Sequence, residues 1–104
     1  MKPLFDESKL YTFTYGGHNF YIPKRMESGI ELYIKKGIMP GSFLTAVICN
    51  DLQGAVGAAD SENIHNLPAY VSWFYNEAPH NCWGSKERMH AWVGKFFQGE
   101  ELDD

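Results

Sequence analysis

The chain has 104 residues, which is enough for one domain and excludes a second domain of ordinary size. With 44% hydrophobic, 15% aromatic and 21% charged residues, the composition excludes a disordered chain and favours an ordered globular one. The formal net charge of −4 disfavours nucleic acid as a partner, because a DNA-binding surface normally needs an excess of basic residues.

The first element that we expect is a β-hairpin over residues 11–22. Aromatic and β-branched residues lie on both sides of Gly16-Gly17, and these glycines supply the positive φ angles of a two-residue turn. The turn imposes three cross-strand pairs on one face of the hairpin: Tyr11 with Ile22, Phe13 with Phe20, and Tyr15 with His18. Because an isolated hairpin is marginally stable in water, this aromatic face is expected to pack on another element.

The rest of the chain predicts about four short helices, over residues 24–36, 42–59, 61–78 and 85–98. Gly37 is a suitable stop for the first helix, Asp60 or Ser61 can cap the third, and Pro68 predicts a kink or restart near Leu67. Residues 99–104 form an acidic tail that we expect to be frayed. The predicted fold is α+β, with an N-terminal β-hairpin packed on a compact bundle of about four short helices in a single domain, 1–104.

The two cysteines, Cys49 and Cys82, are too few for a disulfide framework. Cys49 lies in an apolar run, where a buried free thiol is the ordinary outcome. No apolar run approaches the ~18 residues of a membrane span, and the first residues lack a signal-peptide pattern. These features predict a soluble protein of a reducing cytoplasm.

Asn50 and Asp51 interrupt the apolar stretch of the second predicted helix. Asp51 falls on the apolar side of that helix, where a carboxylate needs a partner because burying it unpaired is costly. One interpretation is that Asp51 pairs with Arg25 or caps a neighbouring helix. The other is that Asn50 and Asp51 are polar groups that line a pocket.

Residues 76–85 combine an amide, an acid, an imidazole, a thiol and an indole in one short segment, where binding sites tend to lie. His80 and Cys82 have the residue types of a metal site or of a Cys–His nucleophile pair. The spacing of the remaining cysteine and histidines does not match a structural zinc site, so we expect no metal, no other cofactor and no complete catalytic set. Trp83 is either a plug over the end of the bundle or a stacking surface for a planar ligand or partner.

Seven Phe, six Tyr and three Trp residues are more aromatic side chains than a core of this size needs. Most of them fall on predicted core positions of the hairpin and the helices. The rings whose exposure would distinguish a binding surface from a crowded core are Tyr15, Tyr21, Trp73, Tyr75 and Trp83.

A longer pattern runs from Ile22 to Trp92, over about two-thirds of the chain. Its main parts are Ile22-Pro23-x-Arg25-Met26, Pro40-Gly41-x-Phe43-Leu44-x-Ala46-Val47-x-x-Asn50-Asp51-Leu52, Tyr75-Asn76-Glu77-Ala78-Pro79 and Cys82-Trp83-Gly84-Ser85. This pattern resembles a family of small, largely uncharacterised proteins encoded by bacteriophages and prophages. The resemblance implies a phage origin and the host bacterial cytoplasm as the place of action.

These observations predict a non-enzymatic phage protein that counteracts host defence, by sequestering a small nucleotide-like ligand or by inhibiting a host protein. Arg25 would meet an anionic group, Trp83 would stack, and amides and carboxylates would read polar edges. The expected ligand-binding residues are Arg25, Tyr33, Asn50, Asp51, Asp60, Asn76 and Trp83.

The main alternative is a homodimeric protein-interaction module without a small-molecule ligand, in which a homo-oligomer covers the excess aromatic surface. An enzyme that acts through Cys82 is less favoured. A helix-turn-helix around Gly37–Gly41 ranks last, because the helix that follows is apolar where base-reading residues are needed.

Overall fold

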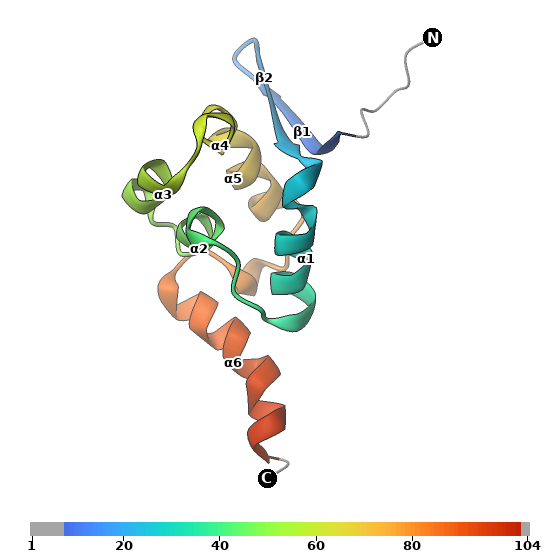
Figure 1. Cartoon of the computed structure of the whole chain (residues 1–104), viewed down its shortest axis with the longest axis vertical. Coiled ribbons are helices and arrows are strands. Elements are labelled where there is room, and N and C mark those ends of the chain that lie inside the picture. Colours follow the sequence, from blue (N-terminus) through green and yellow to red (C-terminus); the bar gives the residue numbers. More distant parts are fainter. Residues whose placement is uncertain (1–7, 103–104) are drawn as a thin grey trace.

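The computed structural model describes residues 8–102, and side chains as far as residue 97. The elements follow in the order β1 (Lys9–Tyr15), β2 (His18–Pro23), the 3-10 turn η1 (Lys24–Met26), α1 (Glu27–Lys36), α2 (Ser42–Ile48), α3 (Leu52–Ala58), α4 (Ser61–His65), α5 (Leu67–Asn76), the 3-10 turn η2 (His80–Cys82) and α6 (Lys86–Leu102). The hairpin lies at one end of the molecule and α6 extends from the other (Figure 1). The predicted α+β fold is confirmed, although the described residues form six α-helices rather than about four.

The hairpin has the predicted register. The pairs are Tyr11 with Ile22, Phe13 with Phe20, and Tyr15 with His18. Gly16 and Gly17 have φ values of +59° and +80°, the left-handed conformation that a two-residue turn requires. The aromatic face packs on α4 and α5, where Tyr11 and Ser72 share a hydrogen bond of 2.8 Å.

Residues 42–59, predicted as one helix, form the two helices α2 and α3. The chain turns at Asn50, whose φ of +59° is uncommon outside glycine but is tolerated by asparagine. The Asp51 N–H closes α2 by donating to the Ala46 carbonyl at 2.8 Å. The Asp51 carboxylate then caps α3 by accepting the Gly54 N–H at 2.9 Å. The prediction of one helix is wrong because the apolar spacing continues across a turn that redirects the chain.

Residues 61–78 also form two helices, with the predicted restart at Leu67. Asp60 caps α4 by accepting the Asn63 N–H at 2.8 Å, as predicted. At the junction, the fully buried side chain of Asn66, which directly precedes α5, connects this point to α4 and to β2. Its amide donates to the Glu62 carbonyl at 2.9 Å and accepts the Tyr21 N–H of β2 at 2.9 Å.

α6 begins after Ser85, whose hydroxyl accepts the Arg88 N–H at 3.1 Å. The helix continues to Leu102, so the predicted end at residue 98 is wrong and residues 99–102 of the expected acidic tail are helical. The last part of that tail, residues 103–104, lies outside the described residues. Among the described residues, no helix combines the length and the apolar character that crossing a bilayer would require.

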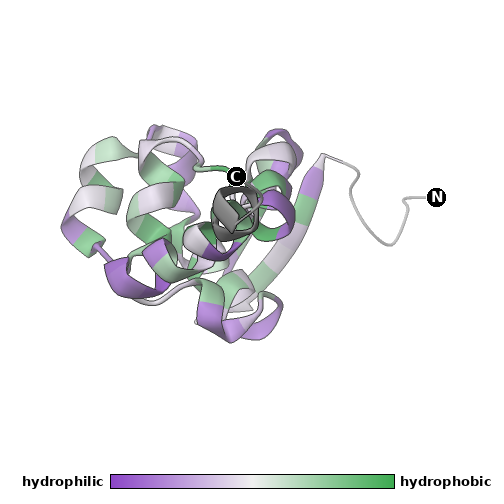
Figure 2. Ribbon diagram, turned by 90° about the horizontal axis from the view of Figure 1, so that it is seen from below, coloured by the Kyte–Doolittle hydropathy of each residue, from purple (hydrophilic) through white to green (hydrophobic). Residues whose placement is uncertain are grey.

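The core lies between the hairpin and the helices, with hydrophobic residues concentrated on the inner parts of the helices (Figure 2). Its largest fully buried aromatic side chains are Tyr33, Tyr70 and Phe74. Burial requires both tyrosine hydroxyls to find acceptors: Tyr33 donates to the Cys82 carbonyl at 2.6 Å and Tyr70 to Asn63 Oδ1 at 2.6 Å. These bonds attach α1 to the η2 loop and α5 to α4.

α1 ends at Gly37, whose φ of +67° confirms the predicted stop. A Cβ atom at this position would lie 2.9 Å from Cγ of Phe96 on α6. Gly37 therefore meets two constraints, a left-handed backbone and a close approach of α6.

We predict that Gly37→Ala lowers the free energy of unfolding by about 1–3 kcal/mol, because it strains the backbone and displaces the Phe96 ring. Gly94→Ala is the matched control, since a Cβ at Gly94 meets open space within α6. That change is expected to stabilise the protein by about 0.5–1 kcal/mol through helix propensity. Urea unfolding measures both free energies. Equal effects of the two substitutions would contradict the two constraints inferred at Gly37.

Candidate functional site

Arg25 is held by two carboxylates at the start of α4. Its guanidinium donates to Glu62 at 2.9 and 3.1 Å, and to Asp60 at 3.1 Å. The Tyr21 hydroxyl donates to the other oxygen of Glu62 at 2.7 Å. Of the two structural roles predicted for Asp51, pairing with Arg25 is wrong, because the fold brings Asp60 and Glu62 to Arg25 instead. The other, capping of a helix, is confirmed at α3.

This network shifts the titration of both carboxylates. The hydrogen bond from Tyr21, followed by that from Arg25, lowers the pKa of Glu62 below its ordinary value. The Asn63 backbone N–H, assisted by Arg25, likewise lowers the pKa of Asp60. Both carboxylates therefore favour the charged form, through hydrogen bonds that the folded chain makes with itself.

Tyr33 has no exposed surface to offer a ligand. Its side chain is fully buried and its hydroxyl is bonded to the Cys82 carbonyl. The carbonyl of Tyr33 accepts the indole N–H of Trp92 at 3.0 Å. This expected site residue is therefore part of the core.

Asn50, Asp51 and Trp83 come together in a small cleft between α3 and α5, which we call the Trp83 cleft. Its cavity volume is about 40 Å³. The lining residues are Ala46, Val47, Asn50, Asp51, Leu52, Ala55, Leu67, Val71 and Trp83. Trp83 packs on Phe74 with a ring separation of 5.7 Å, so part of the indole does close the core. Within residues 8–97, neither the Trp83 indole N–H nor the Asn50 amide makes a hydrogen bond, so both polar groups are available.

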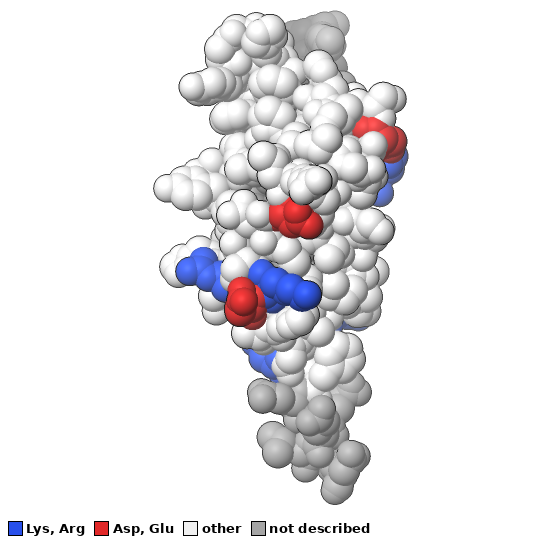
Figure 3. All heavy atoms as spheres, turned by 90° about the vertical axis from the view of Figure 1, so that its left-hand side faces the viewer, with Lys and Arg blue, Asp and Glu red and all other residues white. Residues whose placement is uncertain are grey.

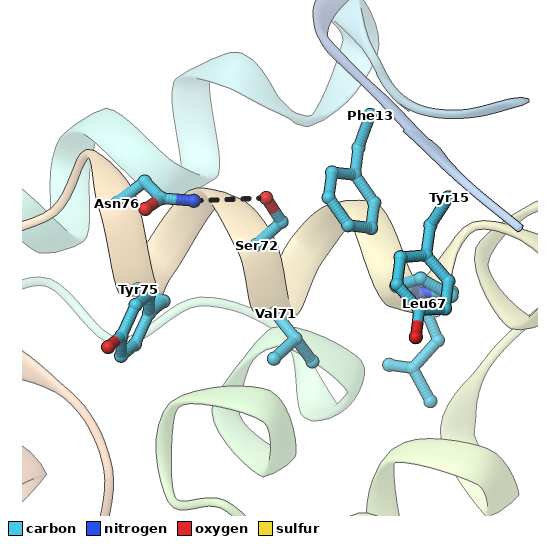
Figure 4. Close-up of a pocket in the computed structure, with 8 residues that line it drawn as sticks. Phe13, Tyr15, Leu67, Val71, Ser72, Tyr75 and Asn76 are labelled. Atoms are coloured by element: carbon cyan, nitrogen blue, oxygen red, sulfur yellow. Dashed lines mark hydrogen bonds between the residues drawn. The ribbon is translucent and has the colours of Figure 1, made fainter.

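Asn76 lies in a second, larger depression between β1 and α5, which we call the edge groove (Figure 4). Its cavity volume is about 560 Å³, and its lining residues are Phe13, Tyr15, Leu67, Pro68, Val71, Ser72, Tyr75 and Asn76. The amide of Asn76 donates to Ser72 at 3.2 Å. Tyr15 and Tyr75 are 73% and 75% exposed, so two rings of the sequence-derived group form this surface. Leu67 and Val71 are common to the edge groove and the Trp83 cleft.

A third depression lies where α2, α3 and α6 meet, and we call it the polar depression. Its cavity volume is about 620 Å³, and its lining includes Ser42, Thr45, Asn50, Asp51 and Lys86. Lys86 brings a cation to this surface, and it was not among the ligand-binding residues expected from the sequence. Only the packing of the start of α6 beside the α2–α3 turn places it there.

The side of the molecule that carries α3 has few charged side chains, and basic ones gather toward the start of α6 (Figure 3). Leu52 and Val56 of α3 are 68% and 49% exposed. α3 lies at the periphery of the molecule, yet its ribbon carries hydrophobic residues (Figure 2). Sequence reasoning missed these surface residues because it treated residues 42–59 as one helix, in which apolar residues at this spacing would share one buried face. The Asn50-Asp51 pair, a turn residue followed by a capping residue, was the available signal.

Cys82 does not have the environment of a nucleophile. It is fully buried, and burial raises the pKa of its thiol to about 11, whereas a reactive cysteine needs a lowered pKa. Among the described residues, no group of three or more His, Cys, Asp or Glu side chains is placed to hold a metal ion.

Comparisons of the chain with protein-family models, with curated proteins and with solved structures gave no match.

We predict that the Arg25 network stabilises the fold at neutral pH and loses this effect in acid. Because the folded pKa values of Asp60 and Glu62 are lowered, their contribution is present above the ordinary carboxyl range and disappears as the pH falls below about 4. Arg25→Gln should therefore lower the melting temperature at pH 7 and have little effect near pH 2. Lys35→Gln, which removes an exposed ion pair with Glu31, is the control and should change little at either pH. An Arg25→Gln effect that does not depend on pH would exclude the electrostatic explanation.

Proposed function

We propose that this chain is a non-enzymatic, phage-encoded binding protein that acts in the cytoplasm of a bacterial host by binding a host protein. Its binding surface is the Trp83 cleft together with the outer side of α3. The observation that carries the proposal is the exposure of Leu52 and Val56 beside this cleft, on a side of the molecule with few charges (Figure 3).

The size of the Trp83 cleft favours a protein partner over a small molecule. Small-molecule sites have cavity volumes of roughly 300–1,000 Å³, whereas this cleft has about 40 Å³. Such a volume accepts part of one side chain from a partner. Protein interfaces use buried anchors of this kind, surrounded by apolar contacts and a polar rim.

The composition of the surface fits that arrangement. Leu52 and Val56 are spaced i, i+4 and form an exposed apolar stripe on α3. Ala55 is the one residue of this helix that is buried. Asn50 and the second carboxylate oxygen of Asp51 supply hydrogen-bonding groups at the rim. An apolar stripe turned away from the core is typical of an interaction surface.

The phage origin is supported by the sequence resemblance, and its motifs bear on the same surface. Asn50-Asp51-Leu52 and Cys82-Trp83-Gly84-Ser85 are separated in the sequence, yet both contribute residues to the Trp83 cleft. The Gly84 N–H donates to the Ile48 carbonyl at 2.8 Å and holds the two segments together.

We predict that Leu52→Asp weakens binding of the host protein by at least about tenfold, because it places a charge within an apolar interface. The partner would be identified by cross-linking and affinity capture from a bacterial lysate, and its affinity for purified variants measured by interferometry. Gln53→Asp adds the same charge to the neighbouring exposed position of α3 and is the matched control. Equal capture of every host protein by the wild type and by Leu52→Asp would contradict the proposal.

A second candidate, binding of a nucleotide-like ligand, is favoured by the polar depression. Its volume of about 620 Å³ is in the range of small-molecule sites, and Lys86 is a cation for an anionic group. Asn50 and Asp51 would then read the polar edges of the ligand. Arg25, in contrast, is occupied by its carboxylate partners.

If this second function holds, calorimetry with a panel of linear and cyclic nucleotides should detect a ligand whose affinity falls about tenfold in Lys86→Ala. Lys36→Ala, a change at an exposed lysine at the end of α1, should leave the affinity unchanged. Absence of heat with every nucleotide would exclude this candidate.

A further inference from the structure

We propose that the outer edge of β1 is the interface between two copies of this chain, and that the two strands pair antiparallel about a two-fold axis at Phe13. The resulting dimer would contain a continuous four-stranded sheet. The proposal rests on the hairpin and the edge groove rather than on the outer side of α3, although the edge groove shares Leu67 and Val71 with the Trp83 cleft.

The register of the hairpin shows which backbone groups point outward. In a two-residue hairpin the residues that flank the turn exchange hydrogen bonds, and bonded pairs then alternate with non-bonded ones. Starting from Tyr15 and His18, the outward-facing residues are Thr12 and Thr14 on β1, and Asn19 and Tyr21 on β2. The Tyr21 N–H indeed points away from β1, because it donates to Asn66.

The two edges of the hairpin are treated differently by the rest of the fold. Asn66 and α4 cover the outer edge of β2 at Tyr21. Within the described residues, the outward N–H and C=O groups of Thr12 and Thr14 have no partner. Residues 10–15 contain neither a charged residue nor a proline, two of the devices that prevent an exposed edge from pairing. A third device, a bulge, is confined to the start of β1, between Lys9 and Tyr11. This edge is therefore competent to add another strand.

The sequence of β1 identifies that strand as a second copy. Residues 11–15 read Tyr-Thr-Phe-Thr-Tyr, which is the same in both directions. Antiparallel pairing about Phe13 places Thr12 opposite Thr14 of the second copy, so the outward backbone groups of both strands meet as bonded pairs. The same axis places Phe13 opposite its own equivalent and Tyr11 opposite Tyr15. Such a self-complementary surface is what an isologous dimer requires.

The edge groove accommodates the side chains that this pairing brings. Phe13 and Tyr15 project from β1 toward α5 and form one wall of the groove (Figure 4). An added strand lies about 4.8 Å beside β1 and has the same alternation, so its three aromatic rings project over the groove. They would cover Tyr15, Val71 and Tyr75, which the single chain leaves exposed. The lining of the groove carries no charged residue, so pairing buries no unpaired charge.

The test uses the full-length chain and places charged side chains at Thr12 and Thr14, the two residues of β1 whose backbone groups point outward. In the proposed pairing, Thr12→Lys combined with Thr14→Lys puts like charges directly opposite each other twice, which disfavours the pair. Thr12→Glu combined with Thr14→Lys puts opposite charges at the same positions. Both variants lose the same hydrogen bond from Thr14 to Asn19, so they differ only in the charge at position 12.

Sedimentation equilibrium is expected to give a dimer for the wild type and at least about a tenfold weaker dimer for the Lys/Lys variant. The Glu/Lys variant should return to within a few-fold of the wild type, and its dimer should weaken as salt is raised. Circular dichroism establishes that both variants are folded. Leu52→Asp, outside this interface, should remain dimeric, which separates this proposal from the function proposed above.

A wild type that remains monomeric at concentrations of about 100 µM would overturn the proposal. So would a Lys/Lys variant that dimerises as tightly as the wild type, or a folded Glu/Lys variant that does not recover dimerisation. Loss of a host partner from the Lys/Lys variant, with no change in oligomeric state, would reassign the edge to another protein.

Discussion

The buried amide of Asn66 is the contact on which the arrangement of this protein depends. It joins β2 to α4 by accepting the Tyr21 N–H and donating to the Glu62 carbonyl, and its side chain is fully buried. A buried amide that loses a partner costs about 1–3 kcal/mol, so loss of either hydrogen bond would destabilise the fold. Because Asn66 also lies where α4 ends and α5 begins, one residue sets the position of the hairpin relative to the helices and determines which strand edge faces outward.

Polar and apolar groups are separated as a result. Arg25, Asp60, Glu62 and Tyr21 satisfy one another at the junction of the hairpin with α4. Arg25 and Asp60, which the sequence predicted as ligand-binding residues, are therefore paired within the fold. The two surfaces next to α5, the edge groove and the Trp83 cleft, are mainly apolar and share Leu67 and Val71. A chain of this size needs most of its apolar residues for its core. Apolar residues that remain together at the surface therefore indicate contacts with other chains.

Features set by neighbouring residues could be predicted, whereas those set by distant ones could not. The Gly-Gly turn, the stop at Gly37, the cap at Asp60 and the restart at Leu67 each follow from residues within one helical turn. The break at Asn50 was missed because asparagine permits a left-handed conformation without requiring it. Of the expected site residues, Asn50, Asp51 and Trp83 do meet, but Arg25, Asp60 and Tyr33 are committed elsewhere. Residue type indicated their chemistry and not their partners.

By itself, the sequence determined the hairpin and its register, the α+β class and several helix boundaries, including those at Gly37, Asp60 and Leu67, because these depend on local backbone preferences and on the spacing of apolar residues. Only the tertiary structure decided that Arg25 contacts Asp60 and Glu62, that Leu52 and Val56 face outward, and that β1 rather than β2 has an open edge. The physical reason is that a hydrogen bond, an ion pair or a covered strand edge depends on which distant groups reach the same place. That placement follows from packing the whole chain around Asn66, and no local pattern encodes it.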